Sequence, residues 1–154
     1  ALSALGRDAS VVHTTVAAEA ERIGLATRLL DRPVNVDLSG GEKKRNETMQ
    51  LAVLRPKFAI LDELDSGLDV DALRACSRRV EAATTEFNLG VLAITHYSRL
   101  LEELKPDVVH VLAQGRIVAA GGPELADELE RTGYAEWVED EPPAAADPFA
   151  DPFA

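Results

Sequence analysis

The strongest constraint on the fold is a short apolar run, residues 58–61, that ends in two adjacent carboxylates, Asp62 and Glu63. A continuous apolar run of this length is typical of a strand in a parallel sheet that is covered on both faces. Ligands of open α/β sheets bind beyond the carboxyl ends of the strands. The two carboxylates are therefore predicted to lie where a metal ion and an activated water can meet a phosphate group. Two adjacent acids also arise by chance where a strand meets solvent.

Strand-like and helix-like segments alternate along the chain. Expected helices cover residues 16–30, 41–54, 69–86, 97–104 and 123–131, and expected strands cover 58–61, 91–95, 108–112 and 117–119. Residues 114–116, Gln-Gly-Arg, predict a hairpin turn between the last two strands. The alternation indicates an α/β domain with a mostly parallel sheet and flanking helices.

Composition narrows the class of protein. The chain has 154 residues and a net charge of −11, of which residues 127–154 carry −8. This acidity argues against nucleic-acid binding, which needs a basic face. No run of eighteen apolar residues is present, so we expect no membrane insertion. Because Cys76 is the only cysteine, an internal disulfide is excluded. The first residues lack a secretory pattern, and we expect a cytoplasmic protein.

The last sixteen residues, 139–154, differ from the rest of the chain. They are acidic and rich in Pro and Ala, and they repeat the unit Ala-Asp-Pro-Phe. Such a composition predicts a flexible tail. Docking of Phe149 and Phe153 onto another surface is the alternative.

A second motif, Leu-Ser-Gly-Gly-Glu at residues 38–42, opens one of the expected helices. A helix N-terminus attracts anions through its free N–H groups and its dipole. Glycine lets the backbone approach a phosphate closely, and the Ser39 hydroxyl is a further donor. The alternative is a plain capped helix after a flexible turn.

Two further signals follow the carboxylate pair. Residues 66–69, Ser-Gly-Leu-Asp, form a turn in which Asp69 is placed to cap the next helix. His96 directly follows the expected strand 91–95, where an imidazole can donate a hydrogen bond to a phosphate oxygen. A lone histidine is more often an ordinary polar surface residue.

In this order and spacing, the motifs resemble those of the ATP-binding-cassette (ABC) ATPases. Residues 38–42 resemble the signature motif, with Glu in place of the usual Gln, and residues 58–63 resemble the Walker B strand with its catalytic glutamate. Residues 66–69 resemble the D-loop, and His96 resembles the switch histidine. The resemblance implies a P-loop NTPase-like fold that uses ATP and Mg²⁺.

Within these ATPases, the chain resembles the SufC family, the ATPase subunits of SUF iron–sulfur cluster assembly. The resemblance covers roughly residues 16–138. The stretches that carry it are 39–46, 61–73, 95–97, 105–112 and 114–118. Transporter cassettes usually differ after the glycines and in the D-loop, which makes this match specific.

The resemblance implies a role for each motif residue. Asp62 would hold Mg²⁺ through water, Glu63 would be the general base for the attacking water, and His96 would contact the γ-phosphate. The segment Ser39, Gly40, Gly41 and Glu42 would bind the γ-phosphate of ATP held by a partner subunit.

Asp69 would couple the two ATP sites across that dimer. In this family, two cassettes form an ATP-dependent homodimer, and the full-length subunit works with SufB- and SufD-like scaffold proteins. Its function would be to reshape that scaffold through ATP-driven dimerisation.

One part of the family's site is absent from these residues. No Gly-x-x-x-x-Gly-Lys-Ser/Thr (Walker A) loop occurs in the 154 residues. We therefore expect residues 1–138 to be the C-terminal part of an ABC ATPase domain, with the N-terminal part missing. Residues 16–50 would end its helical subdomain and 51–138 would form its core. Such a fragment is expected to have exposed apolar edges and to bind ATP weakly or not at all.

Two other functions stay open on the sequence. The first is the nucleotide-binding subunit of an ABC transporter, because the same fold and chemistry would serve it. The second is a non-catalytic interaction fragment without an ATP site. The partner protein would distinguish the first, and failure to bind ATP with retained partner binding would indicate the second.

Overall fold

The structure is a computed structural model that describes residues 12–30, 33, 36–97, 99–133 and 137. The chain divides into two compact units, Ala1–Lys105 and Pro106–Ala154. The predicted tail, residues 139–154, lies outside the described residues. The predicted boundary at residue 138 therefore stays a prediction.

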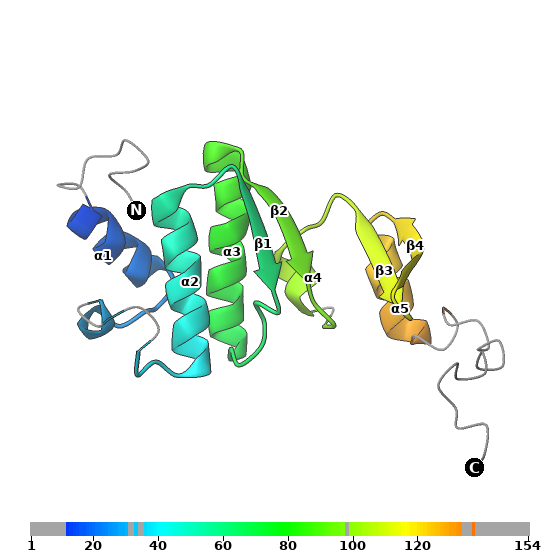
Figure 1. The fold of residues 1–154 in the computed structure, drawn as a ribbon, viewed down its shortest axis with the longest axis horizontal. Coiled ribbons are helices and arrows are strands. Elements are labelled where there is room, and N and C mark those ends of the chain that lie inside the picture. The colour runs from blue at the N-terminus through cyan, green and yellow to red at the C-terminus, as the bar shows by residue number, and fades with distance from the viewer. Residues whose placement is uncertain (1–11, 31–32, 34–35, 98, 134–136, 138–154) are drawn as a thin grey trace, which may run out of the picture. The chain divides into compact units, whose positions relative to one another are not determined.

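The first unit places helices on one face of a parallel strand pair (Figure 1). Its elements are α1 (Val12–Arg22), a 3-10 helix η3 (Thr27–Leu29), α2 (Gly40–Leu54), β1 (Phe58–Asp62), α3 (Val70–Phe87), β2 (Gly90–Ile94) and α4 (Arg99–Glu103). β1 pairs with β2 in parallel, from Phe58 opposite Gly90 to Asp62 opposite Ile94. The register brings the carboxyl ends of both strands to the same edge, as the sequence predicted.

The single helix predicted over residues 16–30 is wrong. α1 ends at Arg22, and the chain turns at Gly24 with φ +65° before η3 begins. The Leu25 N–H bonds to the Ala20 carbonyl at 2.8 Å and closes this turn. The turn returns Leu25 and Leu29 to the core, where both are buried, so the apolar pattern is kept although the helix is interrupted.

The core of this unit joins the helices to one face of the strands. Ile23, Cys76, Val80 and Leu100 are each at most 1% exposed. Leu61, Val91 and Ala93 pack against this cluster from the strands. Burial of these side chains is the main force that holds α1, α2, α3 and α4 against the sheet.

The other face of the strand pair is apolar and exposed. Phe58, Ile60, Leu92 and Ile94 are 57%, 63%, 46% and 49% exposed. The prediction of a strand covered on both faces is therefore wrong for the described residues. We name these four side chains the open sheet face. A Cβ on Gly90 would come within 2.9 Å of the Phe58 ring, so the Phe58 side chain rests where Gly90 leaves space.

The second unit contains a hairpin and a helix. β3 (Val109–Ala113) pairs antiparallel with β4 (Arg116–Gly121), and α5 (Glu124–Thr132) follows. The hairpin predicted at residues 114–116 is confirmed: Gln114 and Gly115 have φ of 47° and 72°, as expected for a tight two-residue turn. These strands form a sheet of their own in the described residues.

Among the helices of the described residues, none has the length and apolarity that a membrane crossing requires.

Candidate functional site

The signature-like segment begins α2 with a reciprocal cap. The Ser39 hydroxyl accepts the N–H of Glu42 at 3.3 Å, and the Ser39 N–H donates to Glu42 Oε2 at 2.9 Å. This capping box satisfies two of the free groups at the helix start. The capped-helix reading is thus confirmed for Ser39 and Glu42, and their role toward a nucleotide stays a prediction.

The structure brings the signature-like segment against the D-loop-like turn. A Cβ on Gly41 would lie 2.9 Å from the Gly67 carbonyl oxygen, closer than real side chains approach backbone. Gly67 has φ +75°, a conformation that favours glycine. Two segments about twenty-five residues apart in sequence are therefore in backbone contact, which the sequence did not predict.

Two basic side chains one turn into α2 strengthen this contact. Lys44 Nζ donates to the Asp62 carbonyl at 2.8 Å, and Arg45 Nη2 lies 3.5 Å from Asp69 Oδ2. Neither residue was assigned a role from the sequence. Both lie in the stretch 39–46 that carries the SufC resemblance, one helical turn after the glycines.

Asp69 caps α3. Its Oδ1 accepts the N–H of Ala72 at 2.7 Å, and the helix begins at Val70. The predicted capping role of Asp69 is confirmed. Its Oδ2 atom contacts Arg45, so the same carboxylate also ties α3 to α2. Its predicted part in coupling two sites is a separate proposal.

Glu63 and His96 face each other at the carboxyl ends of β1 and β2. His96 Nδ1 lies 3.6 Å from Glu63 Oε1, and the side chains are 52% and 50% exposed. The Glu63 N–H donates to the Ile94 carbonyl at 2.9 Å and extends the ladder by one bond. Both side chains are accessible to a ligand from solvent.

The backbone at Glu63 is unusual. Its φ is +47°, a left-handed conformation that is uncommon for residues other than glycine and that costs free energy. This turn at the strand end directs the chain away from the sheet just after Asp62. Such conformations cluster at functional sites.

The carboxylates at this edge of the sheet can supply only some of the ligands that Mg²⁺ needs. In the described part of the chain, no cluster of three or more His, Cys, Asp or Glu side chains is arranged to hold a metal. Mg²⁺ needs only one or two carboxylates when water and phosphate oxygens supply the other ligands. The exposed Asp62 carboxylate at the end of β1 is the protein ligand that this arrangement offers.

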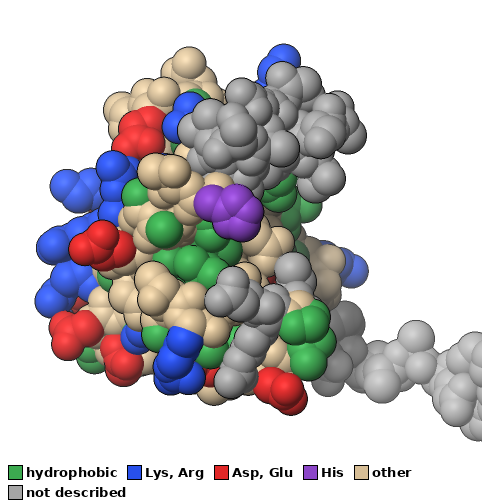
Figure 2. Space-filling view, turned by 90° about the vertical axis from the view of Figure 1, so that its left-hand side faces the viewer, with side chains coloured by type: hydrophobic (Ala, Val, Ile, Leu, Met, Phe, Trp, Pro, Cys, Tyr) green, Lys and Arg blue, Asp and Glu red, His purple; other side chains and the backbone are tan. Residues whose placement is uncertain are grey.

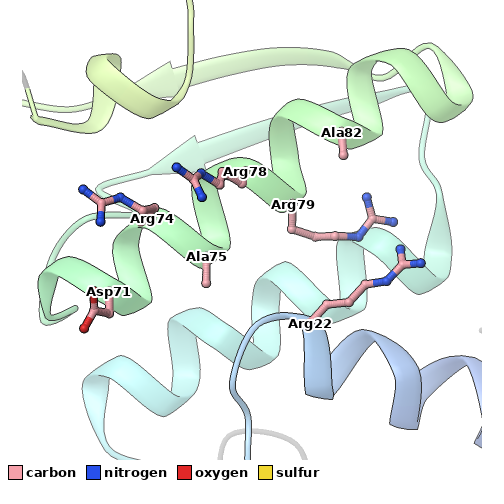
Figure 3. Close-up of a pocket in the computed structure, with 7 residues that line it drawn as sticks. All are labelled: Arg22, Asp71, Arg74, Ala75, Arg78, Arg79 and Ala82. Carbon is pink, nitrogen blue, oxygen red and sulfur yellow. The ribbon is translucent and has the colours of Figure 1, made fainter.

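A hollow lies between α1 and α3, away from the residues described above (Figure 3). Its volume is about 440 Å³, and it is lined by Arg22, Asp71, Arg74, Ala75, Arg78, Arg79 and Ala82. Seen from the side of α1, Lys and Arg side chains also gather along one edge of the surface (Figure 2). None of the motif residues lines this hollow.

The arginines of this hollow have carboxylate partners. Arg22 and Arg79 both contact Glu19, and Arg74 and Arg78 contact the two oxygens of Glu103 at 2.7 and 3.1 Å. The hydrogen bond from Arg74 lowers the pKa of the Glu103 carboxyl, with a further contribution from Arg78. These ion pairs connect helices and largely balance the charge of the hollow.

Cys76 lies in the core and is 0% exposed. Burial raises the pKa of its thiol, because a thiolate is disfavoured in apolar surroundings. This supports a packing role for Cys76.

Several curated proteins are similar in sequence to this chain. No family model matches the chain. It is 51% identical over 121 residues to vegetative protein 296 of Bacillus subtilis strain 168, covering 79% of this chain and 46% of that protein. It is 47% identical over 122 residues to the iron-sulfur cluster assembly protein SufC of Plasmodium berghei, covering 79% and 33%.

A probable ABC transporter ATP-binding protein of Streptococcus pyogenes serotype M3 is 49% identical over 118 residues, covering 77% of this chain and 46% of that protein. The chain thus spans less than half the length of the curated relatives it matches.

Solved structures show the same fold. A bacterial Atm1-family ABC exporter with ATP bound superposes with a TM-score of 0.62 and 28% identity, covering 87% of this chain and 24% of that one. The ADP form of MJ1267, an ATP-binding cassette of an ABC transporter, gives a TM-score of 0.57 at 21% identity over 78% and 46%. The predicted fold class is confirmed. The chain is therefore a homologue of the ABC ATPases, SufC among them, and carries part of their P-loop NTPase-type fold.

Proposed function

We propose that the protein to which this chain belongs is an ABC-type ATPase of iron–sulfur cluster assembly. The observation that carries the proposal is the meeting of Glu63 and His96, 3.6 Å apart at the ends of two parallel strands, beside Asp62. A base, a phosphate-contacting imidazole and a metal-binding carboxylate at one sheet edge are the parts that phosphoryl transfer to water requires.

The proposed chemistry uses these three side chains together. When bound, Mg²⁺ supplies positive charge that offsets the developing charge on the phosphate oxygens. Asp62 would hold that ion through water. Glu63 takes a proton from the water whose oxygen bonds to the γ-phosphorus, while the bond from that phosphorus to the bridging oxygen breaks and ADP leaves. His96 donates a hydrogen bond to the γ-phosphate.

A second molecule of the protein completes the site in this proposal. Ser39, Gly40 and Gly41, with Glu42, bind the γ-phosphate of ATP held by the partner subunit. Asp69 couples the two sites. The start of α2 supports this, because its N–H groups and dipole favour an anion.

The biological role is inferred from relatives. The Plasmodium berghei relative is named iron-sulfur cluster assembly protein SufC, which supports a role in that assembly. We propose that the full-length protein acts there on a SufB- and SufD-like scaffold in the cytoplasm. The Streptococcus pyogenes relative is named probable ABC transporter ATP-binding protein, and this keeps a transporter subunit as the second candidate. Co-purification of soluble scaffold proteins favours the first function, and co-purification of an integral-membrane partner favours the second.

For the 154-residue chain by itself, we propose that ATP binding is lost. The Walker A loop does not occur in its sequence, and the open sheet face is where a further part of the cassette would pack. A parallel sheet is normally covered on both faces. If this chain also retains binding to a partner protein, it is a non-catalytic interaction fragment.

The test compares this chain with the same chain extended upstream through its native coding sequence. ATP binding and turnover are measured with Mg²⁺. We expect only the extended protein to bind and hydrolyse ATP. Turnover by the short chain would overturn the loss of binding, and no turnover by either would overturn the ATPase proposal.

Two variants of the extended protein test the site itself. Glu63→Gln is expected to keep ATP binding and to slow hydrolysis by about 10²-fold, since it removes the general base. The control Glu21→Gln, an exposed carboxylate of α1, should hydrolyse ATP normally. Ser39→Arg is expected to block ATP-dependent dimerisation. Unchanged turnover in Glu63→Gln would refute the role of that residue.

A further inference from the structure

A buried carboxyl group that the proposed chemistry does not use lies next to the site. Asp65, in the turn between β1 and α3, is 0% exposed. Among the described residues its Oδ1 atom has no hydrogen-bond partner, and its Oδ2 atom lies 3.3 Å from the Thr95 hydroxyl. A polar group buried with half its partners missing costs free energy.

Thr95 connects Asp65 to the backbone around His96. The Thr95 hydroxyl donates toward Asp65 Oδ2 and accepts the N–H of Tyr97 at 3.0 Å. Its oxygen is also 3.3 Å from the Tyr97 carbonyl. The residues directly before and after His96 are thus fixed to each other, and both are fixed to the turn that follows Glu63.

Arg99, the first residue of α4, contacts both Asp65 and Tyr97. Its Nη2 donates to the Asp65 carbonyl at 3.4 Å, and its guanidinium lies 5.0 Å from the centre of the Tyr97 ring. The Tyr97 ring in turn lies 4.0 Å from the His96 ring. Three elements, the Asp65 turn, the end of β2 and the start of α4, therefore meet around the segment that carries the imidazole.

We propose that Asp65 is a positioning residue for His96. Through the Thr95 hydroxyl it holds the chain on both sides of His96, so that the imidazole stays 3.6 Å from Glu63. This inference rests on the proposed ATPase function. Positioning matters because a small misplacement of a group in a reacting site can lower the rate by up to about 10²-fold.

The sharpest test changes Thr95 in the extended protein. Thr95→Val keeps the size and removes the hydroxyl, and Thr95→Ser keeps the hydroxyl. We expect Thr95→Val to lower kcat about tenfold and to change KM for ATP much less, because it displaces the γ-phosphate contact of His96 and leaves Ser39, Gly40 and Gly41 in place. Thr95→Ser should keep kcat near wild type. As a matched control, Thr84→Val removes a hydroxyl that bonds within α3, and it should leave kcat unchanged.

Substitutions of Asp65 test the other end of the link. Asp65→Asn keeps an oxygen that accepts the Thr95 hydroxyl and should retain most activity, whereas Asp65→Ala should lower kcat as Thr95→Val does. If both act through one link, the double variant Asp65→Ala with Thr95→Val falls no further than either alone. Additive losses would overturn the proposal.

A measurement without nucleotide separates this inference from the proposed function. In the extended protein, amide hydrogen exchange of residues 95–99 should quicken in Thr95→Val and not in Thr95→Ser. A crystal structure of Thr95→Val should show His96 displaced from Glu63. The positioning role would be overturned if wild type hydrolyses ATP and Thr95→Val shows the same kcat and the same amide exchange as wild type. If wild type does not hydrolyse ATP, the function fails, and the exchange and the distance alone decide whether Asp65 holds His96.

Discussion

Glu19 of α1 and Arg79 of α3 form a buried ion pair between residues sixty positions apart. Their side chains are 8% and 4% exposed. Arg79 Nε and Nη2 both donate to the Glu19 carboxylate, whereas Arg79 Nη1 has no partner among the described residues. The pair fixes α1 to α3 in one orientation, and each charge depends on the other.

Removing the Glu19 charge should therefore destabilise the chain. Breaking a buried pair leaves an uncompensated charge and typically costs about 3–5 kcal/mol. Because Glu86 also contacts Arg79, at 3.2 Å, we expect Glu19→Gln to lower the free energy of unfolding by about 2–3 kcal/mol. Urea denaturation measures this. Glu21→Gln, two positions along α1 and exposed, is the control, and an equal loss in both variants would contradict the buried pair.

Two adjacent glycines should respond in opposite ways to alanine. In Gly41→Ala the new Cβ meets the Gly67 carbonyl oxygen at 2.9 Å, and we expect a loss of about 1–3 kcal/mol, as for other overpacked sites. In Gly40→Ala the Cβ finds no atom within 4 Å. Since alanine favours helix over glycine, this variant should be as stable as wild type or slightly more so. Thermal unfolding of both proteins checks the pair, and equal effects would refute the close contact.

The contact of Glu103 with Arg74 and Arg78 should make stability depend on pH. The pKa of Glu103 is held below its usual 4.5, first by the hydrogen bond from Arg74. A lowered carboxyl pKa contributes stability that is present above the usual pKa and is lost as pH falls through the lowered value.

The Tm gap between wild type and Glu103→Gln should accordingly be constant from pH 7 to about 5 and shrink below about 4. High salt should shrink the gap at neutral pH, because these side chains are partly exposed to solvent. A gap that widens toward acid would contradict the assigned direction.

The open sheet face should cause copies of the isolated chain to associate with one another. Exposed apolar patches of this kind favour association. We expect Ile60→Thr with Leu92→Thr to reduce binding of a hydrophobic dye and to lower the apparent mass in light scattering. Val70→Thr changes a side chain that is 62% exposed outside this face, and it should change neither. A monomeric wild type that binds no dye would show that this face is covered in solution.

Local pattern was enough to predict the order of helices and strands. The apolar run before Asp62, the cap at Ser39 and the Gln114–Gly115 turn each depend on neighbours in sequence, and each is found where expected. The break in the helix at Gly24 was missed because the alanine-rich residues around it keep a helical apolar spacing. The spacing alone does not reveal a left-handed turn.

The absence of a Walker A loop predicted exposed apolar edges, but the sequence could not show that one face of β1 and β2 is open. Phe58 and Ile60 give the same apolar run whether this part of the chain or another part covers them. The site residues were predicted one motif at a time, from residue type and position. Their contacts, Gly41 with Gly67 and Lys44 with the Asp62 carbonyl, depend on how α2 packs against β1 and α3, and so required the structure.

The glycine contact between α2 and the turn before α3 also has a mechanical consequence. Side chains in contact absorb small displacements by changing rotamer, but two backbones in contact have no such freedom. A shift of Gly41 is therefore passed directly to Gly67, and from there to Asp69 at the start of α3. When a neighbouring molecule displaces one of these segments, the other segment moves with it, so the two move together as one rigid body.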